Sequence, residues 1–320
     1  MAIAQKPKKK VVIVGIYLPG IYPAGQDHVV SRLLAPSFLK SAADADPEIS
    51  ECYDIKILDI RTDEPIDEIV NKILFEQPSI VAYSTYMWNY DQVSASVGFI
   101  REKSATIRTI LGGPLVSYTP EEIMLENPGA DIMVRGGGGE LRFRQLLRSN
   151  FSDTELLAIP KISFRDSNRK IIHTEGEVNE DVSEIPSVFE TGAHDLNDGR
   201  KHTVFVETYR GCPFSCGYCI WGPEGASIHK FDLDQICRDI DTIYNNPNVE
   251  TVIFTDACLF YTRKRARVIC DRIGAASCAI PTVFTLDAHV LDEDMCRYLA
   301  QVNLYQNQWH FGIQIHYWRP

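Results

Sequence analysis

Short apolar segments alternate with amphipathic segments along most of the chain, and this alternation limits its fold more than any other feature. The apolar segments of the first half, which have the length of buried strands, lie at 11–18, 53–60, 79–86, 106–114 and 131–140. Segments with helical spacing follow them at 28–42, 65–76, 90–103, 119–127 and from the last strand to about 149. Strand–helix units repeated in this way predict an α/β fold with a doubly wound parallel sheet.

The second half of the chain divides into a polar stretch and a renewed alternation. Residues 151–202 carry short strand-like pieces at 161–165 and 169–174, so we expect a linker with a small hairpin there. Strands are then expected at 203–211, 249–256, 281–287 and 309–314, with helices at 232–245, 262–276 and 292–301. This order predicts the start of a β/α barrel, of which only about four units fit before Pro320. The expected domains are therefore 1–150, the linker 151–202 and a barrel at 203–320 that is incomplete at its C-terminus.

Charge and hydropathy exclude several kinds of partner. The net charge of −11 disfavours binding to a phosphate backbone, so no nucleic-acid partner is expected. No apolar run approaches the ~18 residues of a membrane span, and no signal peptide is recognisable, so we expect a cytoplasmic protein without a membrane partner. In a reducing compartment, nine cysteines indicate metal or cluster chemistry more than a disulfide framework.

Three closely spaced cysteines carry the strongest chemical signal. Cys212, Cys216 and Cys219 have the spacing Cys-x3-Cys-x2-Cys and follow directly after an expected strand. Three thiolates on one loop can bind three irons of a cubane cluster and leave the fourth iron open. A zinc site would need a distant fourth ligand such as Cys237 or His229, and three unrelated buried thiols are the other alternative. We favour a 4Fe-4S cluster.

This segment resembles the signature of the radical SAM superfamily, which has the same cysteine spacing and an aromatic residue before the last cysteine, here Tyr218. The resemblance implies that S-adenosylmethionine (SAM) binds the open iron and is cleaved to a 5′-deoxyadenosyl radical. By the same resemblance, Tyr218 would contact the adenine. Other contacts to SAM or substrate are expected at the ends of the barrel strands, at Asp256, Thr285, Asp287 and Gln314. Asp256 stands where the family has Gly-Gly-Glu, and an ordinary strand-end carboxylate is the alternative.

The first domain resembles the cobalamin-binding domain that precedes the barrel in one radical SAM subclass. The residues that carry this resemblance lie in loops after the strands: Pro19, Gly20, Ser84, Thr85, Tyr86, Gly112, Gly113, Gly137, Gly138 and Glu140. The resemblance implies that Ser84 and Thr85 border the dimethylbenzimidazole tail. Trp88 is a candidate for packing near the corrin, and an ordinary core aromatic is the alternative. Two features depart from related patterns: the last loop has four glycines before Glu140 instead of Gly-Glu-Gly-Glu, and the cobalt-ligating Asp-x-His-x-x-Gly motif is absent from 11–149.

The alternatives for these loops are simple tight turns or a dinucleotide site. The first loop lacks Gly-x-Gly-x-x-Gly, which argues against NAD, and no Gly-x4-Gly-Lys-Ser/Thr is present, which argues against an ATPase. We therefore expect a cobalamin-dependent radical SAM methyltransferase that acts on an unactivated carbon of a small molecule or peptide. A reducing partner such as flavodoxin or ferredoxin would supply electrons. The alternative functions are a cobalamin-dependent rearrangement or cyclisation enzyme, and a truncated fragment that binds cofactor without turnover.

Overall fold

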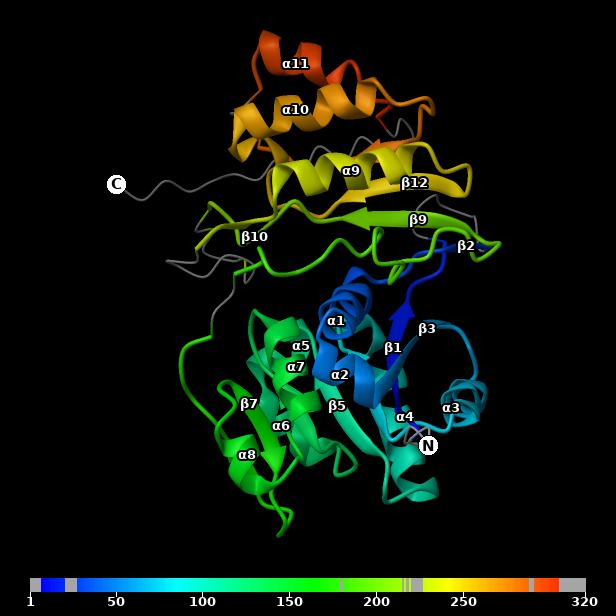
Figure 1. Ribbon diagram of the computed structural model, residues 1–320, viewed down its shortest axis with the longest axis vertical. Coiled ribbons are helices and arrows are strands. Elements are labelled where there is room, and N and C mark those ends of the chain that lie inside the picture. The colour runs from blue at the N-terminus through cyan, green and yellow to red at the C-terminus, as the bar shows by residue number, and fades with distance from the viewer. Residues whose placement is uncertain are drawn as a thin grey trace, which may run out of the picture. The chain divides into compact units, whose positions relative to one another are not determined.

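The structure is a computed structural model that describes residues 7–20, 28–178, 181–214, 216, 219, 227–287 and 291–304. The chain forms two compact units (Figure 1). The first unit comprises Met1–Pro19 and Arg32–His194, and the second comprises Gly20–Ser31 and Asp195–Pro320. The domain limits expected at 150 and 202 stay predictions, because compactness alone does not define a functional domain.

The first unit is built on a seven-stranded sheet. Its strands, in spatial order, are β3 (Tyr53–Arg61), β1 (Lys9–Tyr17), β4 (Ile80–Ser84), β5 (Arg108–Gly112), β6 (Ile132–Val134), β7 (Ile162–Arg165) and β8 (Ile171–His173). The first five strands are parallel, and the last two add to β6 as an antiparallel hairpin. The hairpin expected between 161 and 174 therefore forms, and it extends the main sheet instead of standing apart from it.

Helices cover both faces of this sheet, as a doubly wound fold requires. One apolar cluster joins the sheet to α1 (Leu34–Asp44), α2 (Pro47–Cys52), α7 (Gly139–Arg148) and α8 (Asp153–Leu157). The other joins it to α3 (Ile66–Phe75), α4 (Tyr90–Lys103), α5 (Pro114–Tyr118) and α6 (Pro120–Glu126). Along β1, Val11 and Ile13 face the first cluster while Val12 and Val14 face the second, which explains why this strand is apolar throughout. The predicted fold class is confirmed.

The first helix begins later than the sequence pattern predicts. A helix was expected from residue 28, whereas α1 starts at Leu34 and Val29–Val30 form the short strand β2. Pro36 explains the difference, because proline lacks an N–H and is tolerated only in the first turn of a helix. The residues before that turn are free to pair, and β2 lies parallel to β9 (Lys201–Val206) in the second unit.

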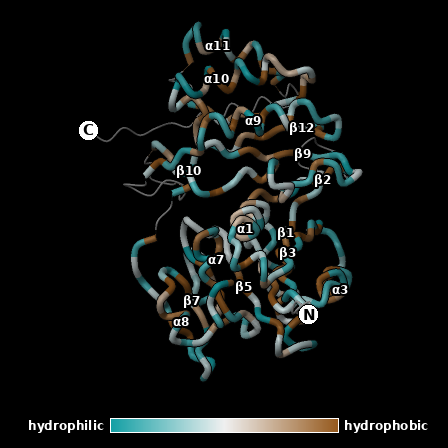
Figure 2. The backbone as a smooth tube through the Cα atoms, viewed as in Figure 1, coloured by the Kyte–Doolittle hydropathy of each residue, from teal (hydrophilic) through white to brown (hydrophobic). Residues whose placement is uncertain are grey.

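The second unit holds a parallel four-stranded sheet in the order β13-β12-β9-β2. Its two remaining strands are β12 (Val249–Phe254) and β13 (Thr282–Val283). Helix α9 (Leu233–Tyr244) packs against α10 (Arg263–Gly274), which packs against α11 (Glu293–Leu299). Figure 2 shows hydrophobic residues along β9 and β12, which supply the centre of this layer. The strand order matches the predicted start of a β/α barrel, and the strand expected at 309–314 lies outside the described residues.

Two further features of the described residues bear on function. The strands β10 (Tyr209–Arg210) and β11 (His229–Lys230) form a separate antiparallel pair around the cysteine segment. Among the helices described, none is both long and apolar enough to cross a bilayer.

Candidate functional site

In the first unit, the loops that follow β4 and β5 are joined closely. The amide of Thr85 donates to the carbonyl of Gly112 at 2.7 Å, next to the last pair of the two strands, Ser84 and Gly112. Gly113 follows with φ +109°, and a Cβ at this position would lie 2.5 Å from the carbonyl oxygen of Thr85. Only glycine fits this approach without displacement of the backbone. The structure therefore brings together Thr85, Gly112 and Gly113, which the sequence placed in loops after two different strands.

The glycine-rich loop after β6 is connected to the loop after β5 through Ser117. The Ser117 hydroxyl donates to the carbonyl of Gly113 at 3.0 Å and accepts the amide of Gly136 at 2.9 Å. From the other side, the guanidinium of Arg142 on α7 donates to the carbonyls of Gly136, at 3.1 Å, and Gly137. Arg142 is 1% exposed, so these bonds provide partners for a charged group inside the unit.

Sequence reasoning missed Ser117 and Arg142. A serine among turn residues carries no distinguishing signal. A signal for Arg142 did exist, because this arginine occupies the buried side of α7 beside Phe143 and Leu146, where an unpaired charge would be costly.

Aromatic side chains are presented after β4. The rings of Tyr86 and Trp88 stack with centroids 4.3 Å apart and an interplanar angle of 14°. Met87 is 83% exposed and Trp88 is 45% exposed, so apolar surface faces solvent here. Asn89 fixes this turn, because its side chain donates to the carbonyls of Ile16 and Ser84, each at 3.0 Å.

Buried hydroxyls complete this edge of the sheet. Ser84 and Thr85 are 4% and 0% exposed. The Thr85 hydroxyl has no hydrogen-bond partner within the described part of the chain. Such a group is normally satisfied by a ligand or water, so it is consistent with a polar group bound beside β4. Glu140 is also buried, and Pro19 and Gly20 lie half-buried in a turn after β1.

In the second unit, the cysteine segment is closed at its base. The neck of the loop is the antiparallel pairing of Tyr209 with Lys230 and of Arg210 with His229. Gly211 begins the loop with φ +93°, and a Cβ there would lie 2.4 Å from the carbonyl oxygen of Ser227. The two arms of the loop therefore touch, and this contact requires a glycine.

None of the three cysteines is in a disulfide, and each is half-buried. The amide of Cys219 donates to the carbonyl of Cys216 at 3.0 Å, which turns the chain between these two residues. Burial raises the pKa of Cys212, a backbone hydrogen bond from Phe214 opposes this shift, and the charges of Cys216 and Cys219 raise the pKa further. Within the described residues, however, no three His, Cys, Asp or Glu side chains are already arranged as a metal site. Tyr218 lies outside the described residues.

The other predicted SAM contacts have different surroundings. Asp256 follows β12, is 2% exposed and accepts three hydrogen bonds from Thr208 and Tyr209. Burial raises its pKa to about 6, against the opposing effect of these bonds and of Arg265. Thr285 is exposed and Asp287 is half-buried, while Gln314 lies outside the described residues.

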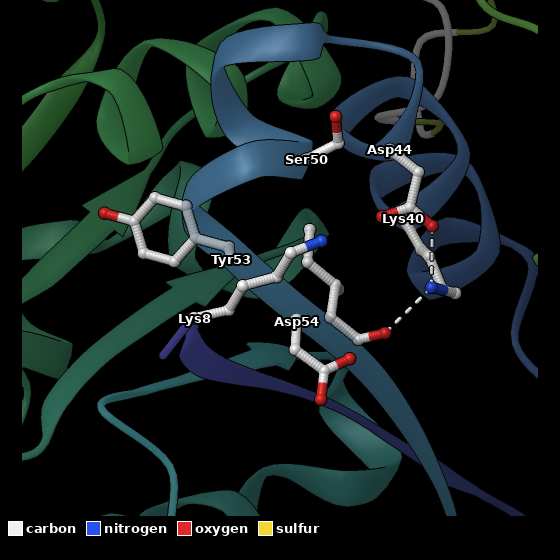
Figure 3. A pocket seen from close by; sticks show the side chains of 7 residues that line it. Lys8, Lys40, Asp44, Ser50, Tyr53 and Asp54 are labelled. Carbon is white, nitrogen blue, oxygen red and sulfur yellow. Dashed lines mark hydrogen bonds and ion pairs between the residues drawn. The ribbon is translucent and has the colours of Figure 1, made fainter. Parts of the chain in front are cut away.

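A separate polar hollow lies at the opposite edge of the first sheet (Figure 3). It is near the amino ends of β1 and β3 and is lined by Lys8, Lys40, Asp44, Ser50, Tyr53, Asp54 and Ile55. The Lys40 ammonium already donates to Asp44 at 2.6 Å and to the carbonyl of Ile55 at 2.8 Å. Ligands of doubly wound sheets bind at the carboxyl ends of the strands, so we assign no function to this hollow.

Comparisons with known proteins agree with this geometry. Residues 48–146 match the family model of the B12 binding domain. The cobalamin-dependent radical SAM methyltransferase TokK of Streptomyces tokunonensis is 26% identical over 245 residues, which span 74% of this chain and 35% of TokK. The structure of the cobalamin-dependent S-adenosylmethionine radical enzyme OxsB superposes with a TM-score of 0.70 at 17% identity, over 93% of this chain and 43% of OxsB.

The chain has the fold of the cobalamin-dependent radical SAM enzymes. The radical SAM methyltransferase TsrM of Kitasatospora setae, solved with cobalamin and a [4Fe-4S] cluster, gives a TM-score of 0.66 at 15% identity over 92% of this chain and 59% of TsrM. The chain therefore spans roughly a third to three-fifths of the length of these relatives. In this chain, the region that matches the B12 binding domain includes the loops at Ser84–Tyr86, Gly112–Gly113 and Gly137–Glu140. The cysteine loop lies outside the matched region.

Proposed function

We propose that this chain forms the cofactor-binding part of a cobalamin-dependent radical SAM methyltransferase. One observation carries the proposal: two cofactor signals occur in the same chain. The first is the match to the B12 binding domain, with its glycine-rich loops, and the second is the Cys-x3-Cys-x2-Cys loop after the first barrel strand, β9. TokK and TsrM are named methyltransferases, which supports methyl transfer over a radical rearrangement.

In this proposal the thiolates of Cys212, Cys216 and Cys219 hold a 4Fe-4S cluster. Soft thiolates suit iron–sulfur chemistry, and the three sulfurs lie on one loop with a closed neck. Three thiols within eight residues fit this group, since none of them is in a disulfide and binding requires only that the loop bring them onto a common centre. Tyr218, Thr285, Asp287 and Gln314 stay predicted contacts of SAM or substrate.

The first unit fits a corrinoid in three respects. Its glycine loops permit close backbone approach, Tyr86 and Trp88 offer an exposed apolar stack, and Thr85 has a buried hydroxyl without a partner in the described residues. In the proposed complex, backbone from Gly112–Gly113 and Gly137–Gly138 would line the ligand, and Pro19, Gly20 and Glu140 stay predicted contacts.

When bound, the cluster and SAM supply a radical that can abstract hydrogen from an unactivated carbon, and the corrinoid supplies the methyl group. The residues of this chain bind and orient these groups and limit the access of water to them. The substrate class that we propose is a small molecule or peptide, and the electrons would come from a protein such as flavodoxin or ferredoxin.

The deciding experiment measures iron and cobalt per chain after anaerobic reconstitution with iron, sulfide and hydroxocobalamin. The parent is compared with a variant carrying Cys212→Ala, Cys216→Ala and Cys219→Ala. We expect the parent to bind both metals, and the variant to lose iron but keep cobalt. Iron without cobalt would refute the cobalamin assignment, and iron that does not depend on these cysteines would refute the cluster assignment.

Activity is tested separately with the reconstituted chain, SAM and a chemical reductant. Formation of 5′-deoxyadenosine is expected in the parent and not in the cysteine variant. A parent that binds both cofactors but does not cleave SAM would support the alternative of a binding fragment without turnover.

A further inference from the structure

The neck of the cysteine loop is held by more than its own strand pairing. The chain enters the neck at Thr208 and leaves it at Phe231, and the amide of Phe231 donates to the carbonyl of Thr208 at 3.1 Å. Between these two residues lie β10, the cysteine loop and β11. Contacts that fix Thr208 and Phe231 therefore fix the two ends of the segment that carries the three cysteines.

Asp256 fixes the entering arm. Its Oδ1 accepts the amides of Thr208, at 2.8 Å, and Tyr209, at 3.0 Å. Its Oδ2 accepts the hydroxyl of Thr208 at 3.0 Å. All three bonds go to the arm that leads to the first cysteine, and the carboxylate is 2% exposed. A carboxylate buried with several donors is a strong anchor, because charge-assisted hydrogen bonds are stronger than neutral ones.

Arg265 fixes both arms at once. This residue lies on α10, and its Nη2 donates to the carbonyl of Thr208 at 3.0 Å and to the carbonyl of Phe231 at 2.8 Å. The peptide groups of Thr208 are thus held between a buried carboxylate and a half-buried guanidinium. Burial raises the pKa of Asp256 and lowers that of Arg265, and the attraction between the two charges opposes both shifts.

Tyr209 provides a further bond to the same region. Its hydroxyl donates to the carbonyl of Cys258 and accepts the amide of Cys258, both at 2.8 Å. Tyr209 is therefore bonded to Asp256 through its main-chain amide and to Cys258 through its side-chain hydroxyl.

We propose that Asp256 and Arg265 are positioning residues that clamp the neck of the cysteine loop and so hold the three thiolates ready for the cluster. This inference rests on the proposed function, because it takes Cys212, Cys216 and Cys219 as the ligands. It gives Asp256 a role different from the SAM contact expected from the sequence. A fixed neck lowers the conformational entropy that cluster binding would otherwise remove from the loop.

The test uses Asp256→Asn as the main variant. Asparagine keeps the shape of the side chain, and its oxygen can still accept the two amides, but it removes the negative charge that strengthens these bonds, and its amide nitrogen cannot accept from the Thr208 hydroxyl. Thr208→Val is a milder variant that removes a single bond to Asp256 and serves if the first variant does not fold. Asp241→Asn is the matched control. Asp241 also accepts a hydrogen bond from an arginine of α10, since the Nε of Arg272 donates to its Oδ1 at 2.6 Å, but this pair lies on the exposed surface.

The first measurement is hydrogen–deuterium exchange of the peptides that contain Thr208, Tyr209 and Phe231, made on the chain without iron. We expect the amides of the neck to exchange about tenfold faster in Asp256→Asn and about threefold faster in Thr208→Val, with no change in the control. The second measurement is the rate at which a chelator removes iron from the reconstituted chain. It is expected to rise in the same order, together with a changed electron paramagnetic resonance spectrum of the reduced cluster.

Exchange at the neck equal to that of the parent would refute the clamp, whatever the iron content. Faster exchange with unchanged iron loss and spectrum would refute its role in holding the thiolates. Weaker SAM binding by Asp256→Asn, with neck exchange and iron retention unchanged, would return Asp256 to the role of SAM contact. Failure of the proposed function is recognised separately, because the parent would then bind no cysteine-dependent iron.

Discussion

Gly113 marks a position where the backbone of one loop lies against the backbone of another. Its φ of +109° is unfavourable for any residue with a side chain, and a Cβ would also meet the Thr85 carbonyl oxygen at 2.5 Å. We predict that Gly113→Ala lowers the free energy of unfolding of the first unit by about 1–3 kcal/mol and weakens cobalamin binding. Urea denaturation without cofactor measures the first effect, and titration with hydroxocobalamin measures the second.

Gly98 offers the matched control for this substitution. It is an exposed residue inside α4, and a Cβ there would meet nothing within 4 Å. Gly98→Ala is expected to stabilise the unit by about 0.5–1 kcal/mol, because alanine loses less backbone entropy in a helix. Equal effects of the two substitutions would contradict the close approach of the loops after β4 and β5.

Cys270 illustrates how burial controls thiol reactivity. It lies on α10 and is fully buried, and burial, with Asp271 adding, raises its pKa to about 12. Because the raised pKa favours the protonated form, the thiol stays un-ionised between pH 7 and 9, and thiolate is the reactive species. We predict that iodoacetamide leaves Cys270 unmodified over this range while it modifies the exposed Cys52 and Cys296. Peptide mass spectrometry would detect the opposite result directly.

At the scale of elements, the turn after β4 brings exposed aromatic surface to the carboxyl edge of the first sheet. We predict that Trp88→Ala weakens cobalamin binding about two- to tenfold without a matching loss of stability, since an aromatic contact contributes roughly 0.5–1.5 kcal/mol. Phe75→Ala is the control, because Phe75 is 83% exposed at the end of α3 on the same unit. A loss of affinity in both variants would show that the effect is not specific to the β4 turn.

The sequence predicted the elements well where apolar periodicity is long, and less well where pairing partners are distant. The helix expected at 90–103 is observed as α4 with the same limits, because its boundaries depend on local signals. The strand β2 has only two residues, and its partner β9 lies about 170 positions away, so no local pattern announces it. The seven-strand width of the first sheet was missed for the same reason, since the hairpin joins β6 through pairing that sequence spacing does not show.

The candidate site was predictable to different depths. Glycines at strand ends were found because close backbone approach requires that residue type. The residues that hold those loops were not found, since the hydroxyl of Ser117 acts through two backbone groups that only the fold brings together. Asp256 was found by its position at a strand end, but its hydrogen-bond partners became known only from the structure.

At the scale of the whole molecule, the two cofactor regions lie in units that each have a sheet of their own. The loops that contain Gly112–Gly113 and Gly137–Gly138 belong to the first unit, and the cysteine loop belongs to the second. Substitutions that share no interaction partner have additive effects. We therefore predict that the two cofactors are lost independently: Trp88→Ala reduces cobalt per chain and leaves iron unchanged, and Cys216→Ala reduces iron and leaves cobalt unchanged.

A double variant tests directly whether the two cofactors bind independently. With Trp88→Ala and Cys216→Ala together, each metal content should equal that of the corresponding single variant, measured by metal analysis after the same anaerobic reconstitution. If loss of iron also lowers cobalt, the energetic coupling between the units is comparable to the binding energies themselves. The first unit would then require the second for its cofactor site, and the two sites would have to be treated as one.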